Sequence, residues 1–276
     1  MTRTEPVGVL IRRWRERRGR SQLDVSVSAE LSTRHLSFVE TGRANPSRGM
    51  IERLCDELDV PLRERNALYL AAGFAPVHTE RPFTDLGAAR AAVEAVLAGH
   101  EPNPALAVNV RWELLAANRA MTVFLQGVPE QLRRPRINVL RATLHPDGLS
   151  RRIVNLAQWR AHVLRRVRRQ LARTAAEGLA ELLAELESYP APAATPVAAA
   201  PAEDLVVPLR LSTEYGELAL LYTMTMFGSP RDVTLDEISI ETFFPADAAT
   251  AELLRAVSDM TAEPPSLVGA VESGVG

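Results

Sequence analysis

The spacing of apolar and polar positions divides the chain into two regions of different character. Over residues 7–75, apolar residues recur every three to four positions in short runs, which is typical of amphipathic helices. Glycine, serine or proline stands between these runs, and these residue types commonly lie at helix ends. The pattern therefore predicts five short helices: residues 7–18, 22–29, 33–40, one after Ser47 that reaches Leu58, and one between Pro61 and Gly73.

From residue 84 onward the pattern mixes helical and strand-like periods. Apolar runs of strand length, with hairpin-length links between them, favour an antiparallel sheet with helices against one face. The predicted helices cover residues 84–98, 118–126, 150–173, 175–187 and 248–260. The predicted strands cover residues 105–109, 112–116, 206–212, 216–227 and 233–244.

Two breaks in composition suggest the domain boundaries. Pro76 and Pro82 flank a short segment between the two regions, and residues 188–202 contain four prolines and seven alanines, which cannot build a core. The predicted fold class is therefore multidomain, α in the first domain and α+β in the second. We expect a domain at 1–76, a linker at 77–83, a second domain at 84–260 with a mobile loop at 188–202, and a flexible tail at 261–276.

The composition argues against several classes of protein. The sequence contains no run of about 18 apolar residues that could span a membrane, and its first residues lack the apolar segment of a signal peptide. Cys55 is the only cysteine, so we expect a reducing cytoplasmic compartment and no disulfide. All 32 basic residues are arginines, which excludes a phosphate-binding loop that ends in Gly-Lys and a Schiff-base lysine. The five histidines share no metal-ligand spacing, so we expect no metal and no cofactor.

The net charge of −2 hides a strong segregation of charge. Residues 133–173 carry a net charge of +11 and residues 174–276 a net charge of −14. The arginines of the predicted helix 150–173 could form a second DNA-contacting surface. We favour a solvated helix face that an acidic row on the next helix partly neutralises. The arginines are Arg165, Arg166, Arg168, Arg169 and Arg173, and the acidic row is Glu177, Glu181 and Glu185.

The most informative segment covers residues 21–47. It holds two short helices separated by about four residues, and Ser26, Leu31, Leu36 and Val39 fall where a helix-turn-helix needs small or apolar positions. In such a motif the second helix lies in the major groove of DNA. An all-helical protein-interaction module is the alternative that this pattern leaves open.

Several motifs give the chain a specific resemblance. These are RHLSFVETGRANPS (34–47), LDVPLRERNALYLAAGFAP (58–76), LHPDG (144–148) and FFPADAATAELLRA (243–256). With them, residues 7–75 resemble the lambda-repressor-like helix-turn-helix of XRE-type regulators. The whole chain resembles the subgroup that carries an MmyB-like ligand-binding domain. This resemblance implies an operator-binding transcription regulator, and it implies a PAS-like second domain, an antiparallel sheet with flanking helices around a pocket.

The resemblance also implies DNA contacts for individual residues. Gln22 would bond a phosphate, and Arg34 can fork to a guanine. Arg15 and Glu40 match a pair that ties the first helix to the recognition helix, for which an ordinary surface pair is the alternative. The residues implied to face the groove are Thr33, Arg34, Ser37 and Phe38, and those implied to hold the DNA backbone are Arg43, Asn45 and Arg48. Glu30 replaces the usual glycine of the turn, so we expect a positive φ at this position, at a cost of order 1 kcal/mol.

The run 218–227 is apolar on both of its alternating faces. Two methionines and a tyrosine on one face can line an adaptable cavity, although the residues alone fit a plain core equally well. The resemblance favours a pocket for a small apolar, fatty-acid-like ligand. The predicted ligand-binding residues are Leu220, Tyr222, Met224 and Met226.

These features lead to one principal function and two alternatives. We expect a cytoplasmic, nucleoid-associated bacterial regulator that binds a double-stranded DNA operator as a homodimer and senses a small apolar ligand. In the first alternative the second domain only dimerises or recruits a protein. The second alternative, an enzyme with a DNA-binding head, lacks a convergent set of acid, base and nucleophile, so we expect no catalytic residues.

Overall fold

The structure is a computed structural model that describes residues 5–190 and 206–260. It consists of two compact units. The first unit comprises Met1–Gly87, Arg166–Ala180 and Met226–Ile238, and the second comprises Ala88–Arg165, Glu181–Thr225 and Ser239–Gly276. Most of the predicted Pro/Ala loop and all of the predicted tail lie outside the described residues.

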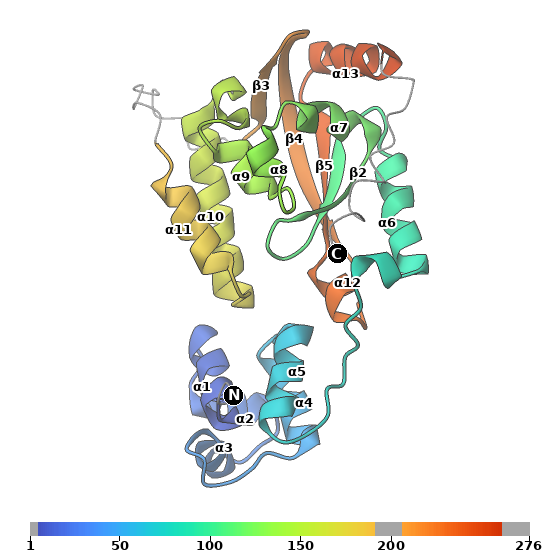
Figure 1. Cartoon of the computed structure of the whole chain (residues 1–276). Helices are drawn as coiled ribbons and strands as arrows, with labels where there is room; N and C mark the ends of the chain where they lie inside the picture. Colours follow the sequence, from blue (N-terminus) through green and yellow to red (C-terminus); the bar gives the residue numbers. More distant parts are fainter. Residues whose placement is uncertain (1–4, 191–205, 261–276) are drawn as a thin grey trace. The chain divides into compact units, whose positions relative to one another are not determined.

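Five helices at the N-terminus form the main body of the first unit (Figure 1). Three of them begin with a serine whose side chain accepts a hydrogen bond from the backbone N–H of the third helical residue: Ser21, Ser32 and Ser47. The sequence pattern predicted these three caps, and the structure confirms them. The helices are α1 (Val7–Arg17), α2 (Gln22–Ser28), α3 (Thr33–Glu40), α4 (Arg48–Glu57) and α5 (Leu62–Ala71).

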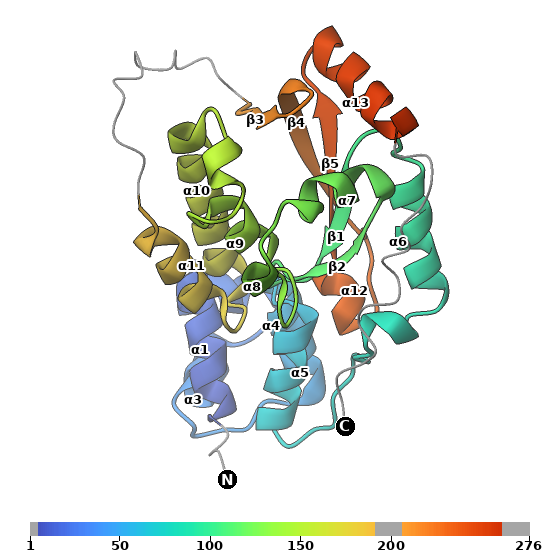
Figure 2. The same cartoon turned by 45° about the horizontal axis from the view of Figure 1, so that its top comes forward.

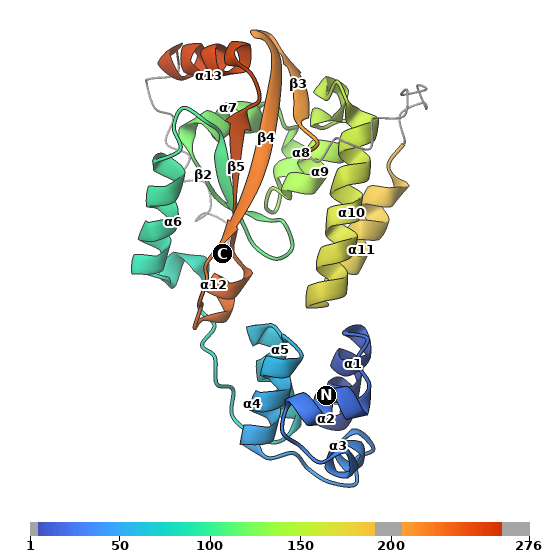
Figure 3. The ribbon, with the colours of Figure 1, turned by 180° about the vertical axis from the view of Figure 1, so that it is seen from behind.

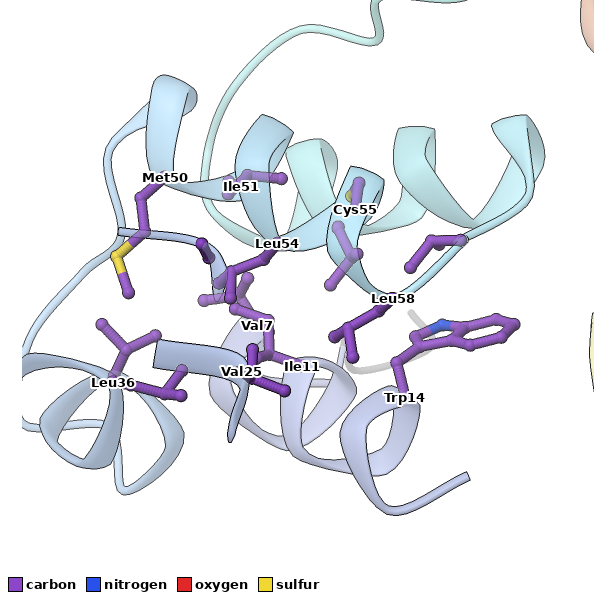
Figure 4. Packing of buried hydrophobic residues seen from close by; sticks show 14 of the residues in the cluster. Val7, Ile11, Trp14, Val25, Leu36, Met50, Ile51, Leu54, Cys55 and Leu58 are labelled. Atoms are coloured by element: carbon purple, nitrogen blue, oxygen red, sulfur yellow. The ribbon is translucent and has the colours of Figure 1, made fainter. Parts of the chain in front are cut away.

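The core of this bundle is built from one apolar stripe on each helix. Figure 4 shows the α4 side chains lying over those of α1, α2 and α3. Gly8 allows the close approach of α1 to α3, because a Cβ at this position would stand 2.1 Å from the carbonyl oxygen of Val39. The largest fully buried side chains of the bundle are Ile11, Val25, Leu36, Val39, Met50, Ile51, Leu54 and Leu58.

A five-stranded sheet with the order β2-β1-β5-β4-β3 organises the second unit (Figures 2 and 3). β1 pairs antiparallel with β2 and β5, and β3 pairs antiparallel with β4. This curved antiparallel sheet with flanking helices confirms the α+β class and is consistent with a PAS-like fold. The strands are β1 (Ala105–Val108), β2 (Leu114–Ala117), β3 (Leu209–Thr213), β4 (Gly216–Met226) and β5 (Ser239–Pro245).

Helices lie beside both edges of this sheet. In Figures 1 and 3, α6 lies toward the β2 edge and α10 toward the β3 edge. The predicted helix 118–126 begins one residue later, because Asn118 caps α7 by accepting a hydrogen bond from the N–H of Met121. The helical elements after the first bundle are η1 (Phe83–Asp85), α6 (Ala88–Ala98), α7 (Arg119–Gln126), α8 (Glu130–Arg133), α9 (Val139–Leu144), η2 (Leu149–Arg152), α10 (Leu156–Thr174), α11 (Leu179–Ser188), α12 (Val233–Glu237) and α13 (Ala248–Met260).

Some predicted elements differ from those in the structure, and local hydrogen bonding explains why. The predicted strand 233–244 begins instead as helix α12, because the buried Asp232 caps it by accepting a hydrogen bond from the N–H of Thr234. The predicted helix 150–173 begins only at Leu156, because the preceding backbone pairs with β3: the N–H of Val154 donates to the carbonyl of Arg210. Helices α8 and α9 were not predicted, and Asn138 caps α9.

Candidate DNA-binding surface and ligand-binding strand

The turn between α2 and α3 has the geometry of a helix-turn-helix. Glu30 has a φ of 54°, in the left-handed region that the sequence analysis anticipated for this position. The N–H of Leu31 donates to the carbonyl of Ser26 at 2.7 Å and closes the turn. Within the turn, the buried Ser26 hydroxyl contacts the Thr33 hydroxyl at 2.7 Å, which ties the start of α3 to α2.

Helix α3 presents a mixed face to solvent at its N-terminal end. Thr33 and Arg34 are exposed, whereas Ser37 and Phe38 are half-buried. The Arg34 guanidinium lies over the Phe38 ring, 5.3 Å from its centroid. Such a contact holds a flexible arginine near one orientation and leaves its N–H groups available to an acceptor. Four residues predicted to face DNA are therefore gathered on one stretch of helix.

The loop after α3 adds a group of exposed polar side chains. Arg43, Asn45 and Arg48 are all exposed, and Arg48 lies at the first position of α4 with its guanidinium over the Tyr69 ring. Backbone bonds from the N–H groups of Arg43 and Ala44 to the Phe38 carbonyl fix the loop against the end of α3. The loop residues predicted to hold the DNA backbone therefore start from a defined loop conformation.

A buried carboxylate connects α1, α2 and α3. Arg15 of α1 donates from Nε and Nη2 to the two carboxylate oxygens of Glu40, at 2.7 and 2.8 Å. Gln22 donates its side-chain amide to Glu40 at 2.7 Å. The Glu40 side chain is only 2% exposed, so the interpretation as an ordinary surface pair is wrong. The hydrogen bond to Glu40 raises the pKa of Arg15 above its ordinary value.

The acidic row expected to neutralise the α10 arginines has a partly different role. Glu185 of α11 binds Arg141 of α9 through both carboxylate oxygens and accepts the hydroxyl of Tyr189 at 2.6 Å. Burial alone would raise the pKa of Glu185, but these hydrogen bonds outweigh it and hold the pKa below its ordinary value. Arg165, Arg169 and Arg173 are exposed to solvent.

The four predicted ligand-binding residues lie along β4, on alternate positions that share one face of the strand. Burial falls steadily along this row: Leu220 is 3% exposed and Tyr222 is half-buried, whereas Met224 and Met226 are 42% and 47% exposed. The row therefore begins in the core and ends at an accessible apolar surface.

Helix α10 packs against this face of β4 through aromatic side chains. The Tyr222 hydroxyl is hydrogen-bonded to the ring Nε2 of His162, and Trp159 stacks on the His162 ring with centroids 5.4 Å apart. The Tyr222 ring also lies 6.4 Å from that of Phe243 on β5. The sequence pattern gave His162 no specific role, because the five histidines share no metal-ligand spacing. The usable signal was its position three residues after Trp159 on one face of a helix.

A shallow groove lies beside the first turns of α10. It has a volume of about 240 Å³ and none of the four β4 residues lines it. Leu156 and Arg160 of α10 form one wall, and the Nε of Arg160 is buried without a hydrogen-bond partner. The remaining lining residues are Leu144, Pro146, Ser150, Arg151 and Pro190.

The remaining histidines and acidic residues do not form a metal centre in the part of the chain that the structure describes, where no group of three or more suitable ligands occurs. His145 of the LHPDG segment has a structural place: its Nδ1 accepts the N–H of Asp147, and its ring contacts that of Tyr189. Within residues 5–190 and 206–260, no helix is both long and apolar enough to cross a membrane.

Two protein-family models match consecutive parts of the chain. A helix-turn-helix domain matches residues 6–68, which contain α1 to α4 and most of α5. The MmyB-like transcription regulator ligand binding domain matches residues 89–257, which is more than half of the chain and contains the whole sheet. The chain belongs to the MmyB-like transcription regulators.

Comparison with individual proteins adds no further assignment for this MmyB-like regulator. No curated protein matches it. Among solved structures, an "RNA-binding Light-Oxygen-Voltage Receptor" matches with 10% identity and a TM-score of 0.26. That match covers 92% of the regulator and 63% of the receptor chain, so the regulator spans less than two thirds of the length of the receptor.

The family assignment gives the two units of the regulator their general roles. The first is built around a helix-turn-helix domain of a DNA-binding regulator, and the second contains most of a ligand-binding domain. The MmyB-like regulator keeps Gln22 bonded to Glu40, so this amide has an intramolecular partner in the absence of DNA. Sequence reasoning missed that bond because the two residues lie in different helices.

Proposed function

We propose that this protein is a cytoplasmic, nucleoid-associated regulator that binds a specific DNA operator as a homodimer and responds to a small apolar, fatty-acid-like ligand. The observation that carries the DNA-binding part is the grouping of Thr33, Arg34, Arg43, Asn45 and Arg48 as exposed side chains on α3 and the following loop. Helix N-termini and arginines at this position of a helix-turn-helix suit base edges and phosphates.

Each group has a distinct role in this proposal. Arg34 reads a base edge, and its contact with Phe38 reduces the freedom that it must lose on binding. Arg43 and Arg48 bind phosphates and set the register of α3 on the duplex. Gln22 can bind a phosphate only if its amide donates a second hydrogen bond or gives up the one to Glu40.

The ligand-binding part of the proposal rests on β4. Met224 and Met226 are accessible, and a flexible apolar chain could lie along them toward the buried Leu220. Tyr222 within this row and His162 beside it, which are hydrogen-bonded to each other, offer polar groups to a ligand headgroup. These features support a binding surface for an amphiphile, since such sites combine apolar walls with few polar groups.

The domain boundaries and the assembly belong to the same proposal. The helix-turn-helix domain ends near residue 76, residues 77–83 link it to the second domain, and the second domain continues to about residue 260. A homodimer would place two recognition helices on half-sites about one helical turn apart. Two symmetric copies bind DNA more tightly than one small domain, and their symmetry fixes the spacing of the half-sites.

Selection of bound DNA from a random pool tests the DNA-binding part, with full-length protein and gel filtration to measure its oligomeric state. We expect enrichment of a symmetric site, and recovery of unenriched sequences would contradict the proposal. Native mass spectrometry of the purified protein tests the ligand part. The variant Met224→Trp/Met226→Trp should lose a co-purified lipid while operator binding persists. A wild-type protein that never carries lipid and never responds to added hexadecanoate would instead support a second domain that only dimerises or recruits a protein.

A further inference from the structure

The first unit contains a segment from far along the chain, residues 226–238, and this segment holds the end of the helix-turn-helix domain. Helix α12 lies between β4 and β5 in the sequence, so it connects the two strands. The last helix of the bundle, α5, begins after Pro61, which has no side chain able to cap it. The carboxylate of Asp236 in α12 accepts a hydrogen bond from the N–H of Leu62 at 3.2 Å. A helix in the distant part of the chain thus supplies the cap that α5 lacks.

An ion pair strengthens this attachment one residue further along both helices. Arg63 of α5 donates from Nε and Nη2 to the two carboxylate oxygens of Glu237, at 2.6 and 3.0 Å. The Glu237 side chain is 16% exposed. Arg63 also pairs with Glu80 at 2.7 Å, so one guanidinium joins α5, α12 and the segment after α5. Bidentate geometry of this kind fixes orientation as well as distance.

The segment that follows α5 is hydrogen-bonded to the start of α12. The carbonyl of Thr79 accepts the N–H of Val233 at 2.8 Å, and the Thr79 hydroxyl donates to the buried carboxylate of Asp232. Arg81 donates to the same carboxylate at 3.1 Å. Three acidic residues of one short stretch, Asp232, Asp236 and Glu237, therefore bind both α5 and the chain that leaves it.

The end of α10 makes a second attachment to the bundle. Arg17 of α1 donates to the carbonyls of Leu171 and Ala172 at 2.9 and 3.2 Å, which satisfies acceptors at the C-terminal end of α10. Ala175 packs against the apolar core of the bundle. Nearer its start, α10 contacts Tyr222 of β4 through His162. Both segments that hold the bundle are therefore continuous with elements that contact or include β4.

We propose that α12 couples β4 and β5 to the helix-turn-helix domain, so that a change at the ligand-binding strand alters operator affinity through the bonds of Asp236 and Glu237 to α5. This inference rests on the proposed function. A ligand changes operator affinity only if it favours one of two arrangements of the protein. A displacement of β4 or β5 moves α12 by covalent connection, and α12 carries the cap and the ion pair that orient α5.

The test uses full-length protein, its selected operator, and hexadecanoate as the added ligand. Operator affinity is measured by fluorescence anisotropy with and without hexadecanoate. In the wild type we expect the ligand to change the dissociation constant at least about fivefold, the lower end of ordinary allosteric coupling. The variant Arg63→Glu, which opposes Glu237 and Glu80, should reduce this change to less than about twofold. The double variant Arg63→Glu/Glu237→Arg restores an ion pair and should recover most of the wild-type change.

Matched controls separate coupling from a general loss of folding. Glu94→Gln breaks the exposed Arg90–Glu94 pair on α6 of the second unit, away from β4, and should keep the full ligand effect. Circular dichroism must show that each variant is folded. If Arg63→Glu unfolds, the variant Asp236→Ala/Glu237→Ala takes its place, because it removes the same bonds without placing two like charges together. A folded variant that keeps the wild-type ligand effect overturns the proposal.

A second measurement distinguishes failure of the coupling from failure of the ligand assignment. Coupling is reciprocal, so operator DNA must also change β4. We expect DNA to alter amide hydrogen exchange of residues 218–226 in the wild type and not in Arg63→Glu. If hexadecanoate has no effect but this exchange response is present and lost in the variant, the ligand class is wrong and the coupling stands. If DNA leaves the exchange of β4 unchanged in the wild type, the coupling is wrong.

Discussion

Arg15 and Glu40 form a two-pronged ion pair between the first helix and the end of the recognition helix, with the glutamate side chain almost completely removed from solvent. The pair fixes the position of α3 relative to α1, because its two parallel hydrogen bonds allow little rotation. Gln22 adds a third bond to the same carboxylate and brings in α2. The surface that we propose to face DNA is thus held at its base by one buried charge network.

Arg15→Leu should destabilise the helix-turn-helix domain by about 3 kcal/mol, because it leaves a buried carboxylate without its main partner. Urea unfolding of the full-length protein, followed by tryptophan fluorescence, measures this loss. Arg12→Leu is the matched control, since the Arg12–Glu16 pair on the same helix is exposed and should matter little. Equal stability of the two variants would show that Glu40 finds compensation elsewhere.

Arg34→Ala should weaken binding to the operator by about 1–3 kcal/mol and relax the preference at one base position. The reason is that a bidentate arginine recognises one base edge. Anisotropy titrations against the operator and against single-base variants measure both effects. Arg111→Ala removes the same charge from an exposed hairpin of the second domain and should leave the preference intact. An equal loss on operator and random DNA would mean that Arg34 contacts phosphate only.

Glu30→Gly should stabilise the protein by about 1 kcal/mol, since Glu30 holds a φ of 54° that costs an ordinary residue about this much. Thermal unfolding monitored by circular dichroism measures the change. Glu94→Gly in the middle of α6 is the opposite case and should lose about 1 kcal/mol, because glycine weakens a helix interior. A loss of stability at position 30 would show that the glutamate side chain makes contacts worth more than the strain.

Gly8→Ala should destabilise the first helix bundle by about 1–3 kcal/mol, because the new methyl group would overlap the Val39 carbonyl and force α1 away from α3. Gly49→Ala is a suitable control: Gly49 also lies in a helix, and no atom stands within 4 Å of a Cβ there. Denaturant midpoints should fall for the first variant and stay level or rise for the second. A level midpoint for Gly8→Ala would mean that the two helices separate at little cost.

Cys55 should resist alkylation in the native protein. It is fully buried in the bundle, and this burial raises the pKa of its thiol to about 12. At pH 8 this thiol therefore stays protonated, and the thiolate is the reactive form. Mass spectrometry after treatment with iodoacetamide should show no modification until urea unfolds the bundle. Rapid labelling at pH 8 without denaturant would reveal frequent opening of the domain.

The sequence by itself determined the helix-turn-helix region in detail. Ser21, Ser32 and Ser47 cap helices through bonds to residues three positions away, and the positive φ of Glu30 follows from its place in the turn. Interactions of this kind are local, so a linear pattern contains them. The alternating apolar runs also predicted β4 almost to the residue, because both of its faces are largely apolar.

The tertiary structure decided the features that join distant residues. The sequence pattern suggested a continuous strand over residues 233–244, yet the buried Asp232 starts a helix there and binds Thr79 and Arg81. Asp236 caps a helix that begins 174 residues earlier in the chain. The Tyr222 hydroxyl is hydrogen-bonded to His162, which lies 60 residues earlier. The spacing of residues along the sequence does not reveal such pairs, because a buried polar group forms its hydrogen bond with whichever partner the fold brings within reach.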